Sequence, residues 1–552
     1  MSGDWGPAFR PWLEQRILED SEQLLVVDKL SGIPTHGGDA GLADDVVRRL
    51  EAYLRAEGRD PTLGVHQRLD LGTSGVLLFA RERALGAAIQ DDFERGRAKK
   101  RYVAAVEVAR GSALEKRDRL TLEHRLEAHG KLRRVTPRGG QECRAECRVL
   151  SRSGSRALCE LRPETGRTHQ LRVQLSAVGA PIAGDRDYDG PLASRLFLHA
   201  ERLELPSVGR AFTAQVPAIF ARWLSGTEAE LANRAEVLQQ LRDAACRRYA
   251  LLEQTDVLRW VNGAGDQLPG IEVDFYRGYA TLAVSSVAAV ARAGELAELL
   301  AELGARGVYL KQRAKADVRQ LDRAELAPAA PLAGAPAEAP LIVREAGLAM
   351  NVELADGLAT GLFVDQRDNR RRVRELSAGA RVLNLFSYTC SFSVAAALGG
   401  ASHVTSVDLS RRALRRGQDN FRLNGLDPTV HGFVCEDVLR FLERAGQRAP
   451  RFDLIVLDPP SFSSAGRGRV LKVERDYERL CGLALRVLAP LGRLVAVTNH
   501  RGTSPAALRA MVLAAARAER YEGQAKELSS GLDCPEGPEG PWPSKSVLFT
   551  RR

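Results

Sequence analysis

Long apolar runs are missing from this sequence of 552 residues, because no stretch reaches the roughly 18 uninterrupted apolar residues of a membrane span. The first residues, M-S-G-D-W-G-P, have neither a basic segment nor an apolar core, so we do not expect them to act as a secretory signal. We therefore expect a cytoplasmic protein that does not enter a membrane.

Cysteine is also scarce, with eight residues in the whole chain. This number does not make a disulfide framework in a chain of this length. Cys143 and Cys147 are close in sequence, but Cys159 and Cys246 do not complete a zinc-binding spacing. We expect reduced thiols and no metal site.

The charge balance lacks a strong bias, with 80 Lys and Arg against 70 Asp and Glu, a net charge of +10. This mild excess permits a polyanionic partner but does not identify one. The content of 44% hydrophobic and 27% charged residues is ordinary for a soluble protein. The length predicts roughly three or four domains.

A polar turn before an apolar strand gives the first candidate for catalysis. Residues 65–81 read V-H-Q-R-L-D-L-G-T-S-G-V-L-L-F-A-R, where Asp70 offers a carboxylate and Arg68 could keep it ionised. A lone Asp at such a place usually caps a turn. The stretch resembles the H-R-L-D-x-x-T-S-G motif of RluA-type pseudouridine synthases, with Gln67 inserted after His66. In that family the Asp is the catalytic nucleophile.

Three further motifs follow in the order that this family has. Lys99–Tyr102 matches K-x-Y, whose Tyr packs against the target base. Thr165–Arg172 reads T-G-R-T-H-Q-L-R and matches T-G-R-x-H-Q-I-R, with G-D-x-x-Y following at Gly184–Tyr188. Leu198–Ala200 matches a late L-H-A strand.

The resemblance covers about residues 15–225 and implies an α+β pseudouridine synthase domain at 1–225, built on an antiparallel sheet. It implies that Asp70 is the nucleophile, that Tyr102 contacts the target base and that Arg172 supports Asp70. It places three more residues at the substrate RNA, namely Arg68, Arg167 and His169. A structural role for His169, satisfied by local hydrogen bonds, is an equal alternative.

Residues 226–340 are expected to join two halves of the chain. Ala218–Ala250 has the apolar spacing of a helix, and Ala324–Pro340 has four prolines among alanines, which is typical of an extended linker. Between them, Asn262–Asp274 reads N-G-A-G-D-Q-L-P-G-I-E-V-D. It resembles a stretch of the RlmI/RlmK group of 23S ribosomal RNA methyltransferases, which implies a small central α+β domain.

The last part, 341–552, has the element order of a doubly wound sheet. A strand at Arg381–Phe386, a polar turn, a helix and a strand that ends in Asp408 form a nucleotide-binding unit. A G-x-G-x-x-G motif is missing. However, G-L-F-V-D-Q-R-D-N-R at Gly361–Arg370 and N-L-F-S-Y-T at Asn384–Thr389 resemble the same methyltransferase group. This implies an α/β class I methyltransferase domain, Rossmann-like, that uses S-adenosylmethionine.

The resemblance also implies which residues bind this cofactor. Asp408 is expected to accept hydrogen bonds from the ribose, and Asp437, at the end of a strand expected at 433–437, to meet the adenine. Cys390 stands where the group usually has Gly. The full set is Asp365, Gln366, Arg367, Asn384, Phe386, Tyr388, Thr389, Asp408, Asp437 and Asp458.

The methyl acceptor is expected beside Asp458-Pro459-Pro460-Ser461-Phe462, which follows an apolar strand. The prolines stiffen the loop and Phe462 can stack on a flat base, so we expect Asp458 to be catalytic and Pro459 and Phe462 to contact RNA. Methylation of cytosine at carbon 5 needs a Cys nucleophile. The RlmI branch has it in S-C-S at the end of the next apolar strand, where this sequence has Thr498-Asn499-His500 instead. The stretch resembles the RlmK branch, which methylates guanine at nitrogen 7, and it places Asn499 at the RNA.

Together the motifs predict a bifunctional RNA-modifying enzyme, a pseudouridine synthase (isomerase) fused to an S-adenosylmethionine-dependent methyltransferase (transferase). The expected partner is RNA, with 23S ribosomal RNA favoured over transfer RNA. Other possibilities stay open: one half serves only as an RNA-docking module, or the methyltransferase acts on cytosine carbon 5 or on a protein.

Overall fold

The computed structural model describes residues 8–37, 44–312, 323–448, 451–460, 462–465, 469–538 and 544–552. The chain forms two compact units. The N-terminal unit comprises Pro7–Ala250 with Ala264–Pro269, and the C-terminal unit includes Leu251–Gly263 and Gly270–Arg552. Within the described ranges, no helix is long and apolar enough to cross a membrane.

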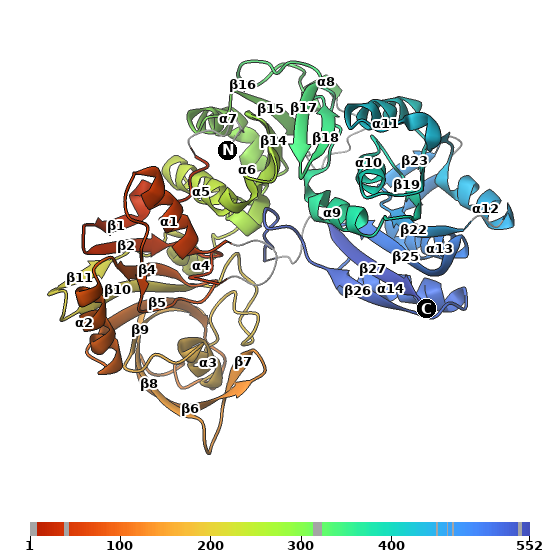
Figure 1. Cartoon of the computed structure of the whole chain (residues 1–552). Helices are drawn as coiled ribbons and strands as arrows, with labels where there is room; N and C mark the ends of the chain where they lie inside the picture. Colours follow the sequence, from red (N-terminus) through yellow and green to blue (C-terminus); the bar gives the residue numbers. More distant parts are fainter. Residues whose placement is uncertain are drawn as a thin grey trace. The chain divides into compact units, whose positions relative to one another are not determined.

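The N-terminal unit is built on one sheet with the strand order β1-β2-β4-β10-β5-β9-β8-β6-β7, with β3 on β4 and β11 on β10 (Figure 1). All of its pairs are antiparallel except β4 with β10. The expected antiparallel sheet is therefore confirmed. The strands are β1 (Ile17–Asp20), β2 (Leu24–Lys29), β3 (Gly64–Val65), β4 (Ser74–Ala80), β5 (Lys99–Glu107), β6 (Arg119–His129), β7 (Leu132–Val135), β8 (Gln141–Ser153), β9 (Arg156–Pro163), β10 (Leu198–Leu205) and β11 (Arg210–Thr213).

The helices of this unit cover the sheet with apolar side chains. Ile219, Phe220 and Trp223 of α4 pack against Val103 and Leu161 in one core cluster. The helices are α1 (Val46–Ala56), α2 (Arg83–Glu94), α3 (Gln170–Ala177), α4 (Ile219–Ser225) and α5 (Arg234–Arg247).

Helix α5 belongs to the N-terminal unit. Its Asp243 binds Arg16 with two hydrogen bonds of 3.0 and 2.5 Å, and the backbone at Cys246 accepts from the Arg49 guanidinium. Residues 226–250, expected to begin the joining part, therefore pack with the first part of the chain.

The C-terminal unit opens with a five-stranded sheet of order β12-β13-β14-β15-β16, followed by the hairpin β17-β18. The predicted linker at Ala324–Pro340 contributes to this sheet, because Ala333–Gly334 pairs with β15. The elements are β12 (Val257–Asn262), β13 (Ile271–Tyr276), β14 (Tyr279–Val284), α6 (Val287–Ala291), α7 (Ala293–Glu302), β15 (Gly307–Gln312), α8 (Arg323–Leu326), β16 (Ala333–Gly334), β17 (Leu341–Glu345) and β18 (Leu348–Val352).

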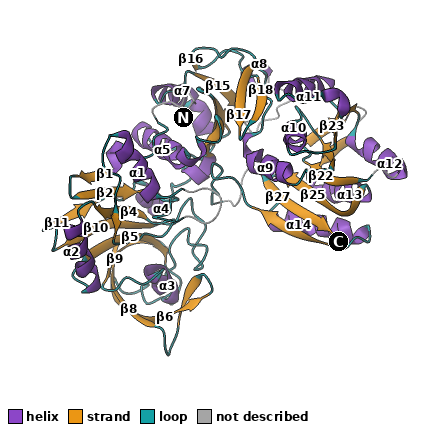
Figure 2. Cartoon of the chain, viewed as in Figure 1, coloured by secondary structure: helices purple, strands orange, loops and turns teal. Residues whose placement is uncertain are grey.

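A seven-stranded sheet of order β21-β20-β19-β22-β25-β27-β26 follows, parallel from β21 to β25. Helices cover both of its faces, so the sheet is doubly wound as expected (Figure 2). Its elements are η4 (Val364–Gln366), α9 (Arg367–Glu375), β19 (Arg381–Leu385), α10 (Ser391–Leu398), β20 (His403–Asp408), α11 (Arg411–Leu423), β21 (Gly432–Cys435), α12 (Val438–Arg448), β22 (Phe452–Leu457), β23 (Phe462–Ala465), β24 (Arg469–Lys472), α13 (Val473–Arg486), β25 (Leu488–Thr498), α14 (Pro505–Ala518), β26 (Gly523–Leu528) and β27 (Lys545–Arg551).

The two faces are covered by different helices. α9 and α10 bury Val373 and Phe392 against one face, whereas α12, α13 and α14 bury Phe441, Leu480 and Val512 against the other. Strand β21 ends at Cys435, two residues before the end expected from the sequence, because Asp437 caps the following helix by accepting from the Arg440 N–H at 3.1 Å.

Candidate active sites

Asp70 lies in the turn that leads into β4, and its side chain is 30% exposed. The Thr73 N–H donates to the Asp70 backbone oxygen at 3.0 Å and closes the turn. Glycine is required shortly afterwards, because Gly75 has a φ of +113° and an added Cβ would lie 2.2 Å from the Ala200 oxygen. The close parallel contact of β4 with β10 therefore fixes the turn that carries Asp70.

Arg172 on α3 joins Asp70 to an acidic cluster. Its guanidinium donates twice to Asp185 at 2.7 Å, once to Asp187 at 2.7 Å and once to Asp70 at 3.5 Å. Burial alone would lower the pKa of Arg172, but the hydrogen bonds and charges of these carboxylates raise it well above its ordinary value. Arg172 is therefore a fixed cation that faces Asp70.

Tyr102 lies on β5, beside Ala200 on one side and Leu161 on the other. Burial, followed by the negative charge of Asp70, raises the pKa of Tyr102 well above its ordinary value. The phenol therefore stays protonated, and its ring packs against two core clusters of the unit.

His169 has a left-handed backbone, with φ 55°, directly before α3. Its Nδ1 lies 2.8 Å from the Tyr188 hydroxyl, which also accepts from the Arg133 N–H at 2.9 Å. Burial lowers the pKa of His169. The imidazole thus has a local hydrogen-bond partner, while Arg68 and Arg167 are exposed.

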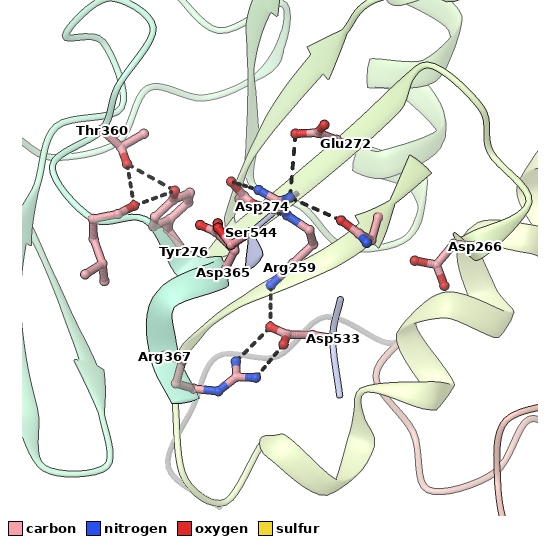
Figure 3. A network of polar contacts seen from close by, with 12 residues as sticks. Arg259, Asp266, Glu272, Asp274, Tyr276, Thr360, Asp365, Arg367, Asp533 and Ser544 are labelled. Atoms are coloured by element: carbon pink, nitrogen blue, oxygen red, sulfur yellow. Dashed lines mark hydrogen bonds and ion pairs between the residues drawn. The ribbon is translucent and has the colours of Figure 1, made fainter. Parts of the chain in front are cut away.

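In the C-terminal unit, Asp365 lies on η4, directly before α9 (Figure 3). Gln366 is the last residue of the same turn. The Ser544 hydroxyl donates to the Asp365 carboxylate and accepts from the Gln366 amide at 2.7 Å. Arg367, the next residue, has a different partner from Ser544. Its buried guanidinium binds both carboxylate oxygens of Asp533. Arg370 is similarly paired with Glu345 at 2.6 and 2.8 Å.

The loop between β19 and α10 has an unusual backbone. Phe386, Tyr388 and Cys390 all have positive φ, between 47° and 64°. Asp408 at the end of β20 holds this loop, because one carboxylate oxygen accepts from the Tyr388 N–H at 2.8 Å and the other from the Ser410 N–H at 2.8 Å. Each carboxylate oxygen keeps a further acceptor site for a ligand.

Two polar side chains of this loop are bound inside the protein. The Asn384 amide donates to the Ser393 hydroxyl at 2.8 Å, and the Thr389 hydroxyl donates to the Gly361 carbonyl. Cys390 is fully buried against Gly417, where an added Cβ would lie 2.4 Å from its Sγ. Burial raises the pKa of Cys390 to about 12.

Asp458 follows β22 at the carboxyl edge of the parallel strands. Burial, with the added charge of Asp365, raises the pKa of Asp458 to about 7, although the Arg370 charge opposes this shift. Pro459 is buried and Asn499 is exposed. Phe462 begins β23, but its side chain lies outside the described part of the chain.

Three further residues of these sites are not among those expected from the sequence. Asp185 lies in the G-D-x-x-Y motif, so its sequence context points to it. Asp533 and Ser544 lie outside the motifs named above for this domain, and only the fold brings them to Arg367 and Asp365.

The residues that surround the Asp408 loop fit S-adenosylmethionine. Phe363 and Leu409 leave large apolar side chains exposed by 47% and 54%, which an adenine can cover. Phe363 lies with its ring 5.5 Å from that of Tyr388. The carboxylates of Asp365 and Asp458 can receive the cationic methionine part of the molecule.

Comparison with known proteins identifies both halves. Residues 23–177 match the family model of RNA pseudouridylate synthases, and residues 295–522 match that of S-adenosylmethionine-dependent methyltransferases. Bacillus subtilis YwbD, assigned by name as a ribosomal RNA large subunit methyltransferase, is 36% identical over 281 residues, which are 50% of this chain and 69% of the relative. A Deinococcus radiodurans ribosomal RNA large subunit methyltransferase is 34% identical over 54% of this chain and 71% of its own length.

Further relatives show the same pattern. The ribosomal RNA large subunit methyltransferase K of Neisseria meningitidis is 45% identical over 161 residues, 29% of this chain and 46% of its own. Among solved structures, SMU.776, assigned as a methyltransferase and complexed with SAH, has a TM-score of 0.51 at 27% identity and covers 58% of this chain and 82% of its own. The chain therefore belongs to the S-adenosylmethionine-dependent ribosomal RNA large subunit methyltransferase family, and its N-terminal part matches the family of RNA pseudouridylate synthases.

Proposed function

We propose that this enzyme isomerises a uridine and methylates a guanine in 23S ribosomal RNA, in the cytoplasm. The proposed division is a synthase domain at 1–225, a joining and central part at 226–340 and a methyltransferase domain at 341–552. The contact that best supports the first activity is the one between Asp70 and Arg172. For the second activity, the most direct support is Asp458 at the carboxyl edge of the doubly wound sheet, next to the charge of Asp365.

In the synthase site, Asp70 is the proposed nucleophile and Arg172 keeps a positive charge beside it. Tyr102, with its hydroxyl protonated, offers its ring to the target base, where stacking offsets part of the cost of unstacking that base. Arg68 and Arg167 are exposed and can contact the phosphates of the RNA. His169 is proposed to border the RNA, with its Nδ1 held by Tyr188.

In the methyltransferase site, the cofactor supplies an electrophilic methyl group. We propose that Asp365, Gln366, Phe386, Tyr388, Asp408 and Asp437 hold it. The backbone of Arg367, the Asn384 amide and the Thr389 hydroxyl keep the shape of that site, because these side chains bind other parts of the protein. Pro459, Phe462 and Asn499 are proposed to contact the acceptor base beside Asp458.

Guanine is favoured over cytosine because Thr498-Asn499-His500 occupies the strand end where the cytosine-methylating branch has its Cys nucleophile, and Cys481 and Cys534 do not replace it. Cys534 is 3% exposed, and burial raises its pKa well above the ordinary value, so it does not supply a thiolate. The Cys481 thiol is fully buried and its pKa is raised by burial as well. Methylation of guanine at a ring nitrogen with a free lone pair needs no covalent catalyst, only orientation of the base.

The experiment is nucleoside and fragment mass spectrometry of ribosomal RNA from a strain that lacks the gene and expresses wild type, Asp70→Asn or Asp458→Ala. We expect Asp70→Asn to abolish one pseudouridine alone and Asp458→Ala to abolish one methylguanosine alone. Normal pseudouridine with Asp70→Asn would favour an RNA-docking role for the first half. A missing 5-methylcytidine, or methyl label that resists ribonuclease, would favour cytosine or a protein as acceptor.

A further inference from the structure

The connection between β26 and β27 reaches the cofactor-binding turn η4 from two sides. Asp533, in the first part of this connection, is 1% exposed and binds the Arg367 guanidinium with both carboxylate oxygens (Figure 3). Ser544, at its end, binds Asp365 and Gln366. One connection therefore holds three consecutive residues of the predicted cofactor motif.

Asp533 also holds the central sheet. One of its oxygens accepts from the Arg259 backbone N–H on β12 at 2.9 Å. β12 is the edge strand of its sheet, so N–H groups on its outer side are available to partners outside the ladder. The Arg259 side chain is engaged separately, by Asp274 at 2.8 Å and by Glu272 at 3.6 Å.

A second hydrogen bond joins the turn that carries Asp533 to β12. The Asn262 amide, at the end of β12, donates to the Pro535 carbonyl at 2.9 Å. Within the turn, the Cys534 N–H donates to the Gly531 carbonyl at 2.9 Å. The turn Gly531–Pro535 is thus bound to β12 through both Asp533 and Pro535.

Space around the ion pair is tight. An added Cβ at Gly531 would lie 2.9 Å from an Asp533 carboxylate oxygen and 3.1 Å from the Arg367 guanidinium. Glycine at this position lets the turn approach the pair closely, so even a methyl group would displace it.

We propose that Asp533 is a positioning residue for S-adenosylmethionine, because it ties the central sheet to the start of α9 and so fixes Asp365 and Gln366 in the cofactor site. The inference rests on the proposed cofactor roles of these two residues. Arg367 opens α9 directly after η4, so a shift of its guanidinium moves the preceding turn. Asp533 acts in this proposal through Arg367, whose guanidinium it binds.

The test is the dissociation constant of S-adenosylmethionine, measured by titration calorimetry on the full chain. We expect Asp533→Asn and Gly531→Ala to weaken binding about tenfold, since small displacements in a preorganised site have large effects. The KM for the cofactor should rise while kcat at saturating cofactor changes less. Pseudouridine formation by the same chain should keep its wild-type rate.

Two variants separate positioning from loss of fold. Asp533→Asn combined with Arg367→Gln leaves no unpaired buried charge, so the thermal midpoint should return toward wild type while weak cofactor binding persists. Asp453→Asn is a matched control, because Asp453 also accepts from a backbone N–H, that of Arg381 at 2.8 Å, and pairs with its guanidinium at 3.5 Å. Asp453 lies near the start of β22, whereas Asp458 follows the end of that strand. The Asp453→Asn variant should therefore bind the cofactor normally.

The outcomes are distinct. Equal cofactor affinity for wild type, Asp533→Asn and Gly531→Ala would overturn the positioning role alone. No binding of S-adenosylmethionine to the unaltered chain would overturn the cofactor roles of Asp365 and Gln366, and the inference with them. Weaker binding in the folded double variant, with a normal Asp453→Asn control, supports the inference.

Discussion

Arg172 lies 3.5 Å from Asp70 but is held at 2.7 Å by both oxygens of Asp185. The tighter pairing shows how the synthase site is organised. Asp185 fixes the direction of the guanidinium, and the guanidinium then presents its remaining nitrogen to the proposed nucleophile. Asp185, which lies outside the first motif, thus fixes the position of the positive charge beside Asp70.

The first prediction concerns Asp185. Asp185→Asn removes the charge that aligns Arg172, so we expect kcat for pseudouridine formation to fall about tenfold or more, with a smaller change in KM. Single-turnover assays on ribosomal RNA fragments measure this. Asp187→Asn is the control, since Asp187 is 48% exposed and accepts one bond from Arg172. An equal loss in both variants would contradict the special role of Asp185.

The second prediction concerns the close contact of β4 with β10. Gly75→Ala places a methyl group 2.2 Å from the Ala200 oxygen and requires alanine to adopt the positive φ of +113° at this position. We expect destabilisation of the N-terminal unit by about 3 kcal/mol or more, seen by calorimetry as an earlier transition. Gly96 has a φ of +67°, and an added Cβ would meet no atom within 4 Å. Gly96→Ala should therefore lower the free energy of unfolding by only about 1 kcal/mol. Similar effects of the two would argue against the steric explanation.

The third prediction concerns the pH dependence of Asp458. The folded protein raises the pKa of this carboxyl to about 7, so between its ordinary value and pH 7 the folded chain binds a proton that the unfolded chain does not. The free energy of unfolding contributed by Asp458 therefore falls as pH rises through this window. Thermal midpoints of wild type should decline more steeply from pH 5 to about 8 than those of Asp458→Asn.

If Asp458→Asn shows the same pH slope as the wild-type protein, the raised pKa of Asp458 is wrong.

The fourth prediction concerns Cys390 and Gly417. Gly417→Ala improves helix propensity by about 0.8–1 kcal/mol but places a methyl group 2.4 Å from the Cys390 Sγ. We expect it to displace the Cys390 loop and to weaken binding of S-adenosylmethionine. In a Cys390→Gly background the clash is gone, so the same change should leave the affinity unaltered. Additive effects in this double-mutant cycle would show that the two residues act independently.

Motif order along the chain is enough to identify the two halves. Asp70, Tyr102 and Arg172 follow one another in the order of one family, and Asp365, Asp408 and Asp458 in the order of another. The doubly wound sheet is predictable for a similar reason, because strands that alternate with helices leave few topologies. The end of β21 differs from its prediction, since the cap made by Asp437 competes with extension of the strand.

The sequence by itself determined the two families, the methyl donor and the residues that carry their motifs, because short motifs keep the chemistry of each site in local order. Only the tertiary structure decided which groups those residues bind. Arg367 pairs with Asp533 at a separation of 166 residues, and Ser544 reaches Asp365 across 179. Burial makes such pairing necessary, since a guanidinium removed from water needs a carboxylate, and no local pattern shows which carboxylate the fold will bring to it.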